Sequence, residues 1–354
     1  MAKNVIVVGA GIIGASLAWN LARSGAQVTV LDSREAGGLA TRHSFAWINA
    51  SWGNPEFYVD FRLRAMREWR QLAAALPGVG VTFCGGLIWD LPPDELEAYA
   101  TEHTGWGYGI RRVDAAEALG VEPGLKSPPD FALHVAEEGM VEPAIAAQVL
   151  LRDAGVPVRT TKVGALIERG GRVAGVSTEA GPIEADEVVV AAGTETAALL
   201  ETAGLSLKLE APAGLIAHST PTDARLLNGL VLSPELHVRQ TAQGRLIVGS
   251  DFAGADPKGR DREMADDLLD KALGMVRGTE RLELDFFTLG HRPTPADGFP
   301  IIGRPRGTEG VYAAVMHSGV TLAPLAGLLG AQEINTGRRD PILAPYDPDR
   351  PAIA

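Results

Sequence analysis

Hydrophobic and polar positions in the first 32 residues follow two periods in turn. The β-branched run Val5–Val8 is typical of a strand that is buried on both faces. Apolar residues then recur every four positions from Ile13 to Leu21, which predicts a helix that stops at Gly25. Residues 28–31 predict a second strand, and it ends at Asp32. The pattern indicates a strand–helix–strand unit of about 30 residues.

A second helix is predicted after residue 54, where Asn54 can cap it and Pro55 takes its first position. Apolar residues at helical spacing predict that it buries one broad stripe. The members of this stripe are Phe57, Phe61, Ala65, Trp69, Leu72 and Leu76.

Further along the chain, alternating apolar residues over 81–91 predict a strand with one covered face. Prolines between 92 and 129 indicate loops or a domain edge. The later predictions are a helix over 143–154, strands over 156–159 and 187–192, a hairpin over 163–178, strands over 229–236, 237–241, 245–250 and 311–315, and a helix over 322–334. We expect residues 211–288 to be rich in strands and residues 290–310 to form a loop.

The turn between the first strand and helix has the sequence Gly9-x-Gly11-x-x-Gly14. Its glycines permit a tight turn, the approach of a pyrophosphate to the backbone, and close packing of helix on strand. Asp32 follows about 18 residues later, where a carboxylate accepts hydrogen bonds from an adenosine ribose and opposes a 2′-phosphate. The motif predicts a dinucleotide site, with a structural turn as the alternative. It does not separate FAD from NAD, and Arg34 nearby keeps NADP open.

Composition narrows the partners and the compartment. The chain has 44 acidic and 32 basic residues and a net charge of −12, which disfavours nucleic acid and anionic lipid surfaces. Its single cysteine, Cys84, excludes an intrachain disulfide and a thiolate metal site, and we expect no metal. No apolar run approaches the roughly 18 residues of a membrane span, and the run Val5–Val8 is too short for a signal peptide. We therefore expect a cytoplasmic protein with no integral membrane segment.

A second group of motifs lies near the C-terminus. Residues 290–303 read GHRPTPADGFPIIG, and residues 317–324 read HSGVTLAP. Residues 139–143 and 186–193 hold two further motifs, Gly-x-Val-x-Pro and a β-branched run that ends in Ala-Ala-Gly. At these positions the chain resembles the D-amino acid oxidase superfamily of flavoproteins, which includes glycine oxidase, sarcosine oxidase and the D-amino acid dehydrogenases. The resemblance covers the first 50 residues, about 139–193 and about 290–335.

The resemblance implies which residues hold FAD. These are Gly9, Gly11, Ile12, Ile13, Gly14, Asp32, Ser33, Arg34, Arg42, His43, Ser44, Val163, Ala192, Gly193, Arg292, Gly303, Ser318, Gly319, Val320 and Thr321. Gly303 and residues 318–321 would present backbone N–H groups to the pyrimidine edge of the flavin, where charge develops on reduction. Relatives with covalent flavin commonly attach it to a cysteine near the C-terminal motif, and this chain has none there, which favours non-covalent FAD. His43 keeps a histidyl link open.

At the substrate end, Arg292 takes the place of the arginine that binds the substrate carboxylate in relatives that oxidise amino acids, a role suited to its forked guanidinium. The alternative is a structural ion pair with Asp297. His43 and His317 are candidates for contact with flavin or substrate, or fill space as hydrogen-bonding residues. Trp47 forms either the active-site wall or core. Arg239 faces the flavin or lies on a solvated sheet edge.

The predicted fold is α/β, with a discontinuous doubly wound FAD-binding domain and a sheet-rich α+β substrate domain. We expect the FAD-binding domain in residues 1–80, 140–210 and 288–345, and the substrate domain in residues 81–139 and 211–287.

The predicted activity is oxidation of the carbon–nitrogen bond of a small amine or amino acid, which could be a D-amino acid, glycine or an N-alkyl amino acid. A hydride passes to the flavin and the imine hydrolyses, with oxygen or another acceptor taking the electrons. The paired tyrosines of vertebrate-type D-amino acid oxidases cannot be placed, so secondary amines are equally open. The alternatives are an FAD-dependent 2-hydroxy acid dehydrogenase and an NAD-dependent dehydrogenase.

Overall fold

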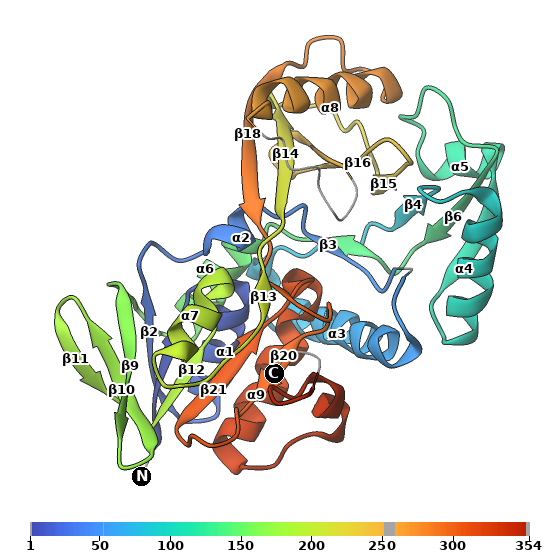
Figure 1. Cartoon of the computed structure of the whole chain (residues 1–354). Helices are drawn as coiled ribbons and strands as arrows, with labels where there is room; N and C mark the ends of the chain where they lie inside the picture. The colour runs from blue at the N-terminus through green and yellow to red at the C-terminus, as the bar shows by residue number, and fades with distance from the viewer. Residues whose placement is uncertain (1, 52, 251–258, 352–354) are drawn as a thin grey trace.

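The computed structural model describes residues 2–51, 53–250 and 259–351. Residues 251–258, which belong to the predicted substrate segment 211–287, lie outside the described residues. Two large sheets, one above the other in Figure 1, organise the chain, and helices cover both of them. The predicted α/β class is confirmed. The proposed division into two domains stays a prediction. The strands of the first sheet all come from the segments expected for the FAD-binding domain, and those of the second sheet come from the substrate segments except that β18 runs past the predicted boundary at residue 287.

The first sheet has six strands in the order β20-β21-β12-β1-β2-β8. They are β1 (Asn4–Val8), β2 (Gln27–Asp32), β8 (Val158–Thr160), β12 (Glu187–Val190), β20 (Ile301–Gly303) and β21 (Val311–Val315). All pair in parallel except β20, which runs antiparallel to β21. The neighbours of β1 are therefore distant in sequence, so this sheet cannot form from one continuous stretch.

Both faces of the first sheet are buried, as the sequence of β1 predicts. Val5 and Val7 pack with the helices α1 (Ile12–Arg23), α3 (Glu56–Ala75), α6 (Pro143–Asp153) and α9 (Gly319–Thr336). Ile6 and Val8 pack on the other face, against a three-stranded sheet of β9 (Val163–Arg169), β10 (Arg172–Thr178) and β11 (Gly181–Glu184). Adjacent side chains of a strand point to opposite faces, so one β-branched run builds two cores.

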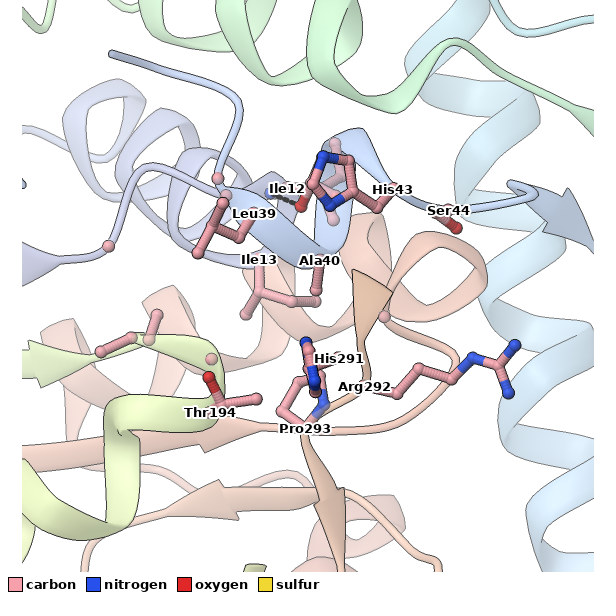
Figure 2. Close-up of a pocket in the computed structure, with 18 of the residues that line it drawn as sticks. Ile12, Ile13, Leu39, Ala40, His43, Ser44, Thr194, His291, Arg292 and Pro293 are labelled. Atoms are coloured by element: carbon pink, nitrogen blue, oxygen red, sulfur yellow. Dashed lines mark hydrogen bonds between the residues drawn. The ribbon is translucent and has the colours of Figure 1, made fainter. Parts of the chain in front are cut away.

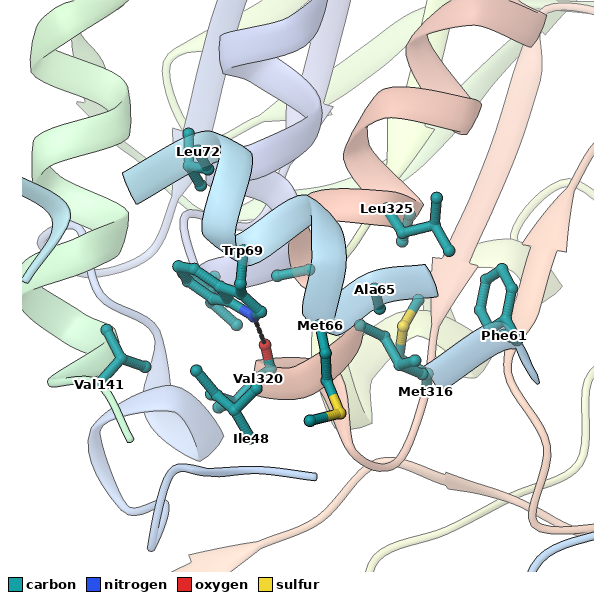
Figure 3. Packing of buried hydrophobic residues seen from close by; sticks show 14 of the residues in the cluster. Ile48, Phe61, Ala65, Met66, Trp69, Leu72, Val141, Met316, Val320 and Leu325 are labelled. Atoms are coloured by element: carbon teal, nitrogen blue, oxygen red, sulfur yellow. Dashed lines mark hydrogen bonds between the residues drawn. The ribbon is translucent and has the colours of Figure 1, made fainter. Parts of the chain in front are cut away.

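Helix α3 fixes the start of α9. Trp69 of α3 is fully buried and donates a hydrogen bond from Nε1 to the carbonyl of Val320 (2.9 Å), as Figure 3 shows. The predicted start of α3 was partly wrong, because Pro55 is the N-cap and the Asn54 side chain donates instead to the carbonyl of Ser51. Phe57 was also misassigned to the buried stripe. It is 43% exposed, whereas its neighbours Tyr58 and Val59 in the same turn of the helix are buried.

The second sheet has eight strands in the order β18-β14-β17-β16-β15-β4-β6-β5. They are β4 (Gly86–Ile88), β5 (Ile110–Asp114), β6 (Phe131–Val135), β14 (Ala213–Ser219), β15 (Leu230–Leu232), β16 (His237–Gln240), β17 (Leu246–Gly249) and β18 (Leu284–His291). Within this sheet, β15 and β4 pair in parallel and all the other described pairs are antiparallel. Helix α8 (Asp261–Met275) lies over β14, β17 and β18 at the top of Figure 1.

Three helices were missed in the predicted substrate segments. Helix α4 (Pro93–Gly105) starts at a proline that we assigned to a loop, although proline suits the first turn of a helix. Helix α5 (Ala115–Val121) has a capping box between Asp114 and Glu117. Helix α8 buries a stripe of apolar residues within a region expected to be strands. The strand predicted over 81–91 shortens to β4.

Short elements join the two sheets. They are α2 (Leu39–Arg42), β3 (Trp47–Ile48), β7 (Gly139–Met140), α7 (Thr196–Glu201), β13 (Leu209–Glu210) and β19 (Thr294–Pro295). Residues 290–310 are therefore not all loop, since they hold β19 and β20. Helix α9 begins at Gly319, three residues before the predicted Leu322. None of the described helices is long and apolar enough to cross a membrane.

Candidate active site

A cavity of about 840 Å³ lies where the carboxyl ends of the parallel strands meet. The turn after β1, the end of β2, the residues after β8, the turn after β12 and the start of α9 all line it. In open α/β sheets, ligands bind at this edge. Strands of the second sheet close the opposite end through residues of β14, β16, β17 and β18. The cavity thus runs from the first sheet to the second.

The glycine turn fits a pyrophosphate. Gly9 has φ of +107°, and a side chain there would overlap the carbonyl of Ala191. A side chain at Gly14 would overlap the carbonyl of Gly9, so this glycine permits close packing of α1 on β1. Gly11 lines the cavity, and α1 begins directly after it without a side-chain cap. The first N–H groups of a helix lack internal partners and favour an anion.

Asp32 marks the adenosine end of the cavity. Its Oδ2 accepts a hydrogen bond from the backbone N–H of Ala10 (2.7 Å), and its Oδ1 accepts one from the backbone N–H of Arg34 (3.0 Å). The carboxylate therefore ties the end of β2 to the glycine turn, and it also lines the cavity. Among the described residues that line this cavity, only Asp32 and Glu195 carry a carboxylate.

The start of α9 presents backbone to the cavity. Ser318 is the N-cap, with φ of +56°, and its side chain makes no capping hydrogen bond. Instead its hydroxyl accepts a hydrogen bond from Nη1 of Arg62 (2.8 Å) and lies 3.0 Å from Nδ1 of His317. Because the serine hydroxyl is engaged elsewhere, the N–H groups of the first turn are left to a ligand. This fits the predicted role of residues 318–321 at a flavin.

Arg292 lies at the end of the cavity that the second sheet closes. It follows β18, and its side chain extends away from Thr194, which belongs to the turn after β12 (Figure 2). A side chain at Gly214 would come within 2.5 Å of Nη2 of Arg292, so glycine makes room for the guanidinium. Asp297 is bound through both carboxylate oxygens by Arg350 (2.6 and 2.8 Å). The structural ion pair considered for Arg292 is thus replaced by an Arg350–Asp297 pair.

Both predicted histidines line the cavity. Figure 2 shows His43 on the same side as the start of α1, across from His291 and Pro293. Loss of solvent on burial lowers the pKa of His43. Burial, together with the positive charges of Arg292 and Arg62, lowers the pKa of His317 to about 4. His317 is therefore neutral at physiological pH.

Three rings form a wall at the end near the second sheet, and all of them line the cavity. The His237 ring lies 6.2 Å from the rings of both Phe45 and Trp47. We call Phe45, Trp47 and His237 the aromatic wall.

Buried polar groups support each member of the aromatic wall from behind. Arg239 donates a hydrogen bond from Nε to the carbonyl of Phe45 (2.5 Å). Glu138 accepts one from Nε1 of Trp47 (2.8 Å). An oxygen of Asp90 lies 3.5 Å from Nε2 of His237.

Most residues predicted at the site line the cavity, and four of the described ones do not. Gly14 serves packing. Arg42 donates to the carbonyl of Ala36 (2.6 Å) and so supports the loop after β2. Gly303 pairs with β21, and a side chain there would meet Arg339, so it is part of the sheet. Arg239 is 1% exposed behind Phe45 and pairs with Glu142 (2.8 Å), so it lies neither against the cavity nor on a solvated edge.

Several contributors to the site are not among the residues predicted from the sequence. His237 lies on the same face of β16 as Arg239, so alternation could have indicated it. Thr41 accepts a hydrogen bond from the backbone N–H of Ile12 (3.1 Å). No pattern in the sequence indicates this contact. Arg62 lies on the apolar stripe of α3 and is buried. Arginine is rarely buried without a partner, so its position within this stripe indicates a polar contact inside the protein. Among the described residues, no cluster of His, Cys, Asp and Glu could hold a metal ion.

Comparisons with known proteins agree with this geometry. The family model described as FAD dependent oxidoreductase (DAO) matches residues 4–333. The chain is 31% identical over 382 residues to a glycine oxidase of Pseudomonas putida, with 99% of each chain covered. Iminodiacetate oxidase from Chelativorans sp. BNC1 is similar in structure, with a TM-score of 0.83 at 27% identity, over 97% of this chain and 98% of that one. Glycine oxidase from Geobacillus kaustophilus shares the fold, with a TM-score of 0.86 at 23% identity over 99% of each chain.

Proposed function

Because the chain belongs to the FAD dependent oxidoreductase family, it is an FAD-dependent amine or amino-acid oxidoreductase, and we propose that its substrate is a small amino acid held by its carboxylate. Glycine, D-amino acids and N-alkyl amino acids all fit this description. The alternative of an NAD-dependent dehydrogenase is wrong, since the family uses FAD. Relatives named glycine oxidase and iminodiacetate oxidase support the proposal, because both names describe oxidation of small amino acids.

The observation that carries the proposal is the position of Arg292. Its guanidinium lies at the cavity end far from Thr194, in space that Gly214 leaves open. A guanidinium fork binds a carboxylate through two hydrogen bonds and so fixes its orientation as well as its distance. A substrate anchored there would place its α-carbon and amine between Arg292 and the start of α9.

The residues around the cavity prepare the substrate for oxidation. FAD, when bound, supplies the acceptor for the hydride that leaves the α-carbon. Arg292 would hold the carboxylate, and the aromatic wall would exclude water from the carbon–nitrogen bond. His317 is an uncharged imidazole at neutral pH, so it adds no positive charge beside the amine. The N–H groups at the start of α9 would stabilise negative charge that develops at the neighbouring edge of the cofactor.

The balance of the reaction is simple. The neutral amine loses a hydride from carbon and a proton from nitrogen, which leaves an imine. Water then hydrolyses the imine to a carbonyl compound and ammonia or a free amine. Oxygen or another acceptor takes the two electrons from the enzyme.

A substrate panel tests the proposal. The purified holoenzyme is offered glycine, both enantiomers of alanine and proline, sarcosine and iminodiacetate, with peroxide and a reducible dye as readouts. Turnover of at least one is the expected result, with release of ammonia or a free amine or, from proline, formation of a cyclic imine that keeps its nitrogen. Turnover of 2-hydroxy acids alone, without a nitrogen product, would replace this proposal by the hydroxy-acid dehydrogenase that uses the same arginine.

The attachment of FAD is tested on the same preparation. We expect acid precipitation to release the yellow colour into the supernatant, because the only cysteine, Cys84, is absent from the cavity lining. Colour that stays in the pellet would indicate a covalent bond to His43.

A further inference from the structure

Glu138 is a completely buried carboxyl group behind the aromatic wall. One of its oxygens accepts the hydrogen bond from Nε1 of Trp47 (2.8 Å), and the other is hydrogen-bonded to the hydroxyl of Tyr108. That hydroxyl also accepts a hydrogen bond from the backbone N–H of Ala50 (3.1 Å). Both oxygens of the carboxyl are thus engaged with buried side chains, and Glu138 itself has no part in the reaction described above.

The surrounding chain is shaped to hold this carboxyl. A side chain at Gly86 of β4 would overlap Oε2 of Glu138, so only glycine leaves the space free. Glu138 directly precedes β7, and β7 pairs with β3 in a register that sets Trp47 opposite Met140. Backbone pairing therefore brings the two side chains together, and the hydrogen bond then fixes the direction of the indole.

Trp47 connects this arrangement to the cavity. It lines the cavity, and its ring meets the His237 ring edge-on, at 6.2 Å between centroids and 75° between planes. Its carbonyl accepts a hydrogen bond from Thr321 at the start of α9 (3.2 Å). A rotated indole would move its N–H away from the Glu138 oxygen, and a buried donor that loses its acceptor is unfavourable. The hydrogen bond to Glu138 therefore selects one orientation of the ring.

We propose that Glu138 is a positioning residue that holds the Trp47 indole as a rigid boundary of the substrate space, so that this boundary limits the size of the substrate side chain. The proposal rests on the proposed function, because it takes the end of the cavity with Arg292 as the substrate end. Specificity for small substrates then depends on a buried group that never touches the substrate.

The protonation of Glu138 suits this role. Burial raises its pKa to about 8, and its hydrogen bonds to Tyr108 and Trp47 oppose the shift only in part. At neutral pH the group is therefore mostly an uncharged acid that still accepts from Trp47. Glutamine is nearly the same shape and also accepts a hydrogen bond, so Glu138→Gln should preserve the boundary.

The test measures which ligands fit, without turnover. Acetate and benzoate are titrated into the holoenzyme, and the flavin absorbance reports the Kd of each. Glu138→Met fills the same space without a comparable acceptor, and we expect it to shift the acetate-to-benzoate Kd ratio by about fivefold or more in favour of benzoate. Glu138→Gln and the control Tyr108→Phe, which keeps the Trp47 hydrogen bond, should stay within about twofold of the wild type. If Glu138→Met loses FAD, Trp47→Phe removes the donor instead and should shift the ratio in the same direction.

Two results would overturn the proposal. One is an equal change of both Kd values in Glu138→Met, and the other is a shift in Tyr108→Phe as large as that in Glu138→Met. The uncharged pair acetamide and benzamide separates this proposal from the carboxylate contact. If acetate fails to bind the wild type while Glu138→Met still favours benzamide over acetamide, the role of Arg292 is wrong and the boundary at Trp47 stands.

Discussion

The cofactor end of the cavity is built from backbone, whereas the substrate end is built from side chains that buried polar groups hold in place. At the first end, the turn of Gly9 and Gly11 and the start of α9 bring N–H groups to the space itself. At the second end, Arg292 and the aromatic wall define the space, and buried residues behind the wall hold its three members in place. The two ends therefore differ in what a substitution can change.

A backbone site tolerates little, because any side chain fills the space that the ligand or a neighbouring carbonyl needs. A side-chain site is adjustable, because its shape depends on rotamers and on the hydrogen bonds that select them. We expect substitutions at the cofactor end to abolish binding altogether, and substitutions at the substrate end to change affinity, selectivity or pH dependence in graded steps.

The largest effect is expected for Gly11→Val. A branched side chain would occupy the place where a pyrophosphate approaches the turn, so the variant should purify folded and colourless. Flavin absorbance per mole of protein measures this, with circular dichroism to show folding. The control is Gly274→Ala in α8, where an added Cβ would meet nothing within 4 Å beyond its chain neighbours and the backbone of its own helix, and it should stay yellow. A yellow Gly11→Val variant would contradict the backbone description of this end.

Arg292→Ala should reduce kcat/KM for carboxylated substrates. The reduction should correspond to a loss of about 2–5 kcal/mol in transition-state binding free energy, the range for truncating one member of a buried charge pair. Arg292→Lys should recover only a part, since an ammonium lacks the fork. FAD content should not change. Steady-state kinetics on a carboxylated amine and its decarboxylated analogue provide the measurement. Equal losses on both substrates would show that Arg292 supports the structure instead of binding the carboxylate.

Glu138→Gln should change how stability depends on pH. The folded protein holds the pKa of Glu138 at about 8, above its ordinary value of 4.5, so the wild type loses stability from this group as pH rises between those values. The variant lacks this loss. We therefore compare the free energy of unfolding of the variant with that of the wild type at each pH. The difference, variant minus wild type, should be more positive at pH 8 than at pH 5, by about 1 kcal/mol or more. Urea unfolding of both proteins at the two pH values measures the difference, and a constant difference would contradict the expectation.

The smallest effect is expected for His317→Gln. Burial and two arginines lower the pKa of His317 to about 4 from 6.5, so the stability it contributes is present above pH 6.5 and is lost as pH falls toward 4. His103 and His218 have pKa values lowered to about 4 as well, so removing one histidine corrects only part of the acid sensitivity. The midpoint of acid unfolding, followed by circular dichroism, should move slightly to lower pH. A move to higher pH would show that the His317 side chain stabilises the fold by other contacts.

The contrast between the two ends also explains what the sequence could predict. The cofactor end follows from local patterns, because a β-branched strand, a glycine turn and a helix lie within one short stretch. The aromatic wall depends on pairs such as Trp47 and Glu138, which are 91 residues apart and meet only through the pairing of β3 with β7. No local period encodes such a meeting. Arg239 was placed in the right strand but in the wrong role, since burial behind Phe45 is a property of the assembled fold.

The order of strands in the first sheet has a consequence for how the protein is made. The sheet begins with β1 and is completed by β21, and the cavity also needs the residues that open α9. A ribosome releases the chain from its N-terminus, at about 5–20 residues per second. The glycine turn therefore emerges many seconds before the segments that enclose the other side of the cofactor. FAD capture is then a late event of biosynthesis, and a cell short of riboflavin should accumulate full-length chains that lack the stabilisation a bound ligand provides.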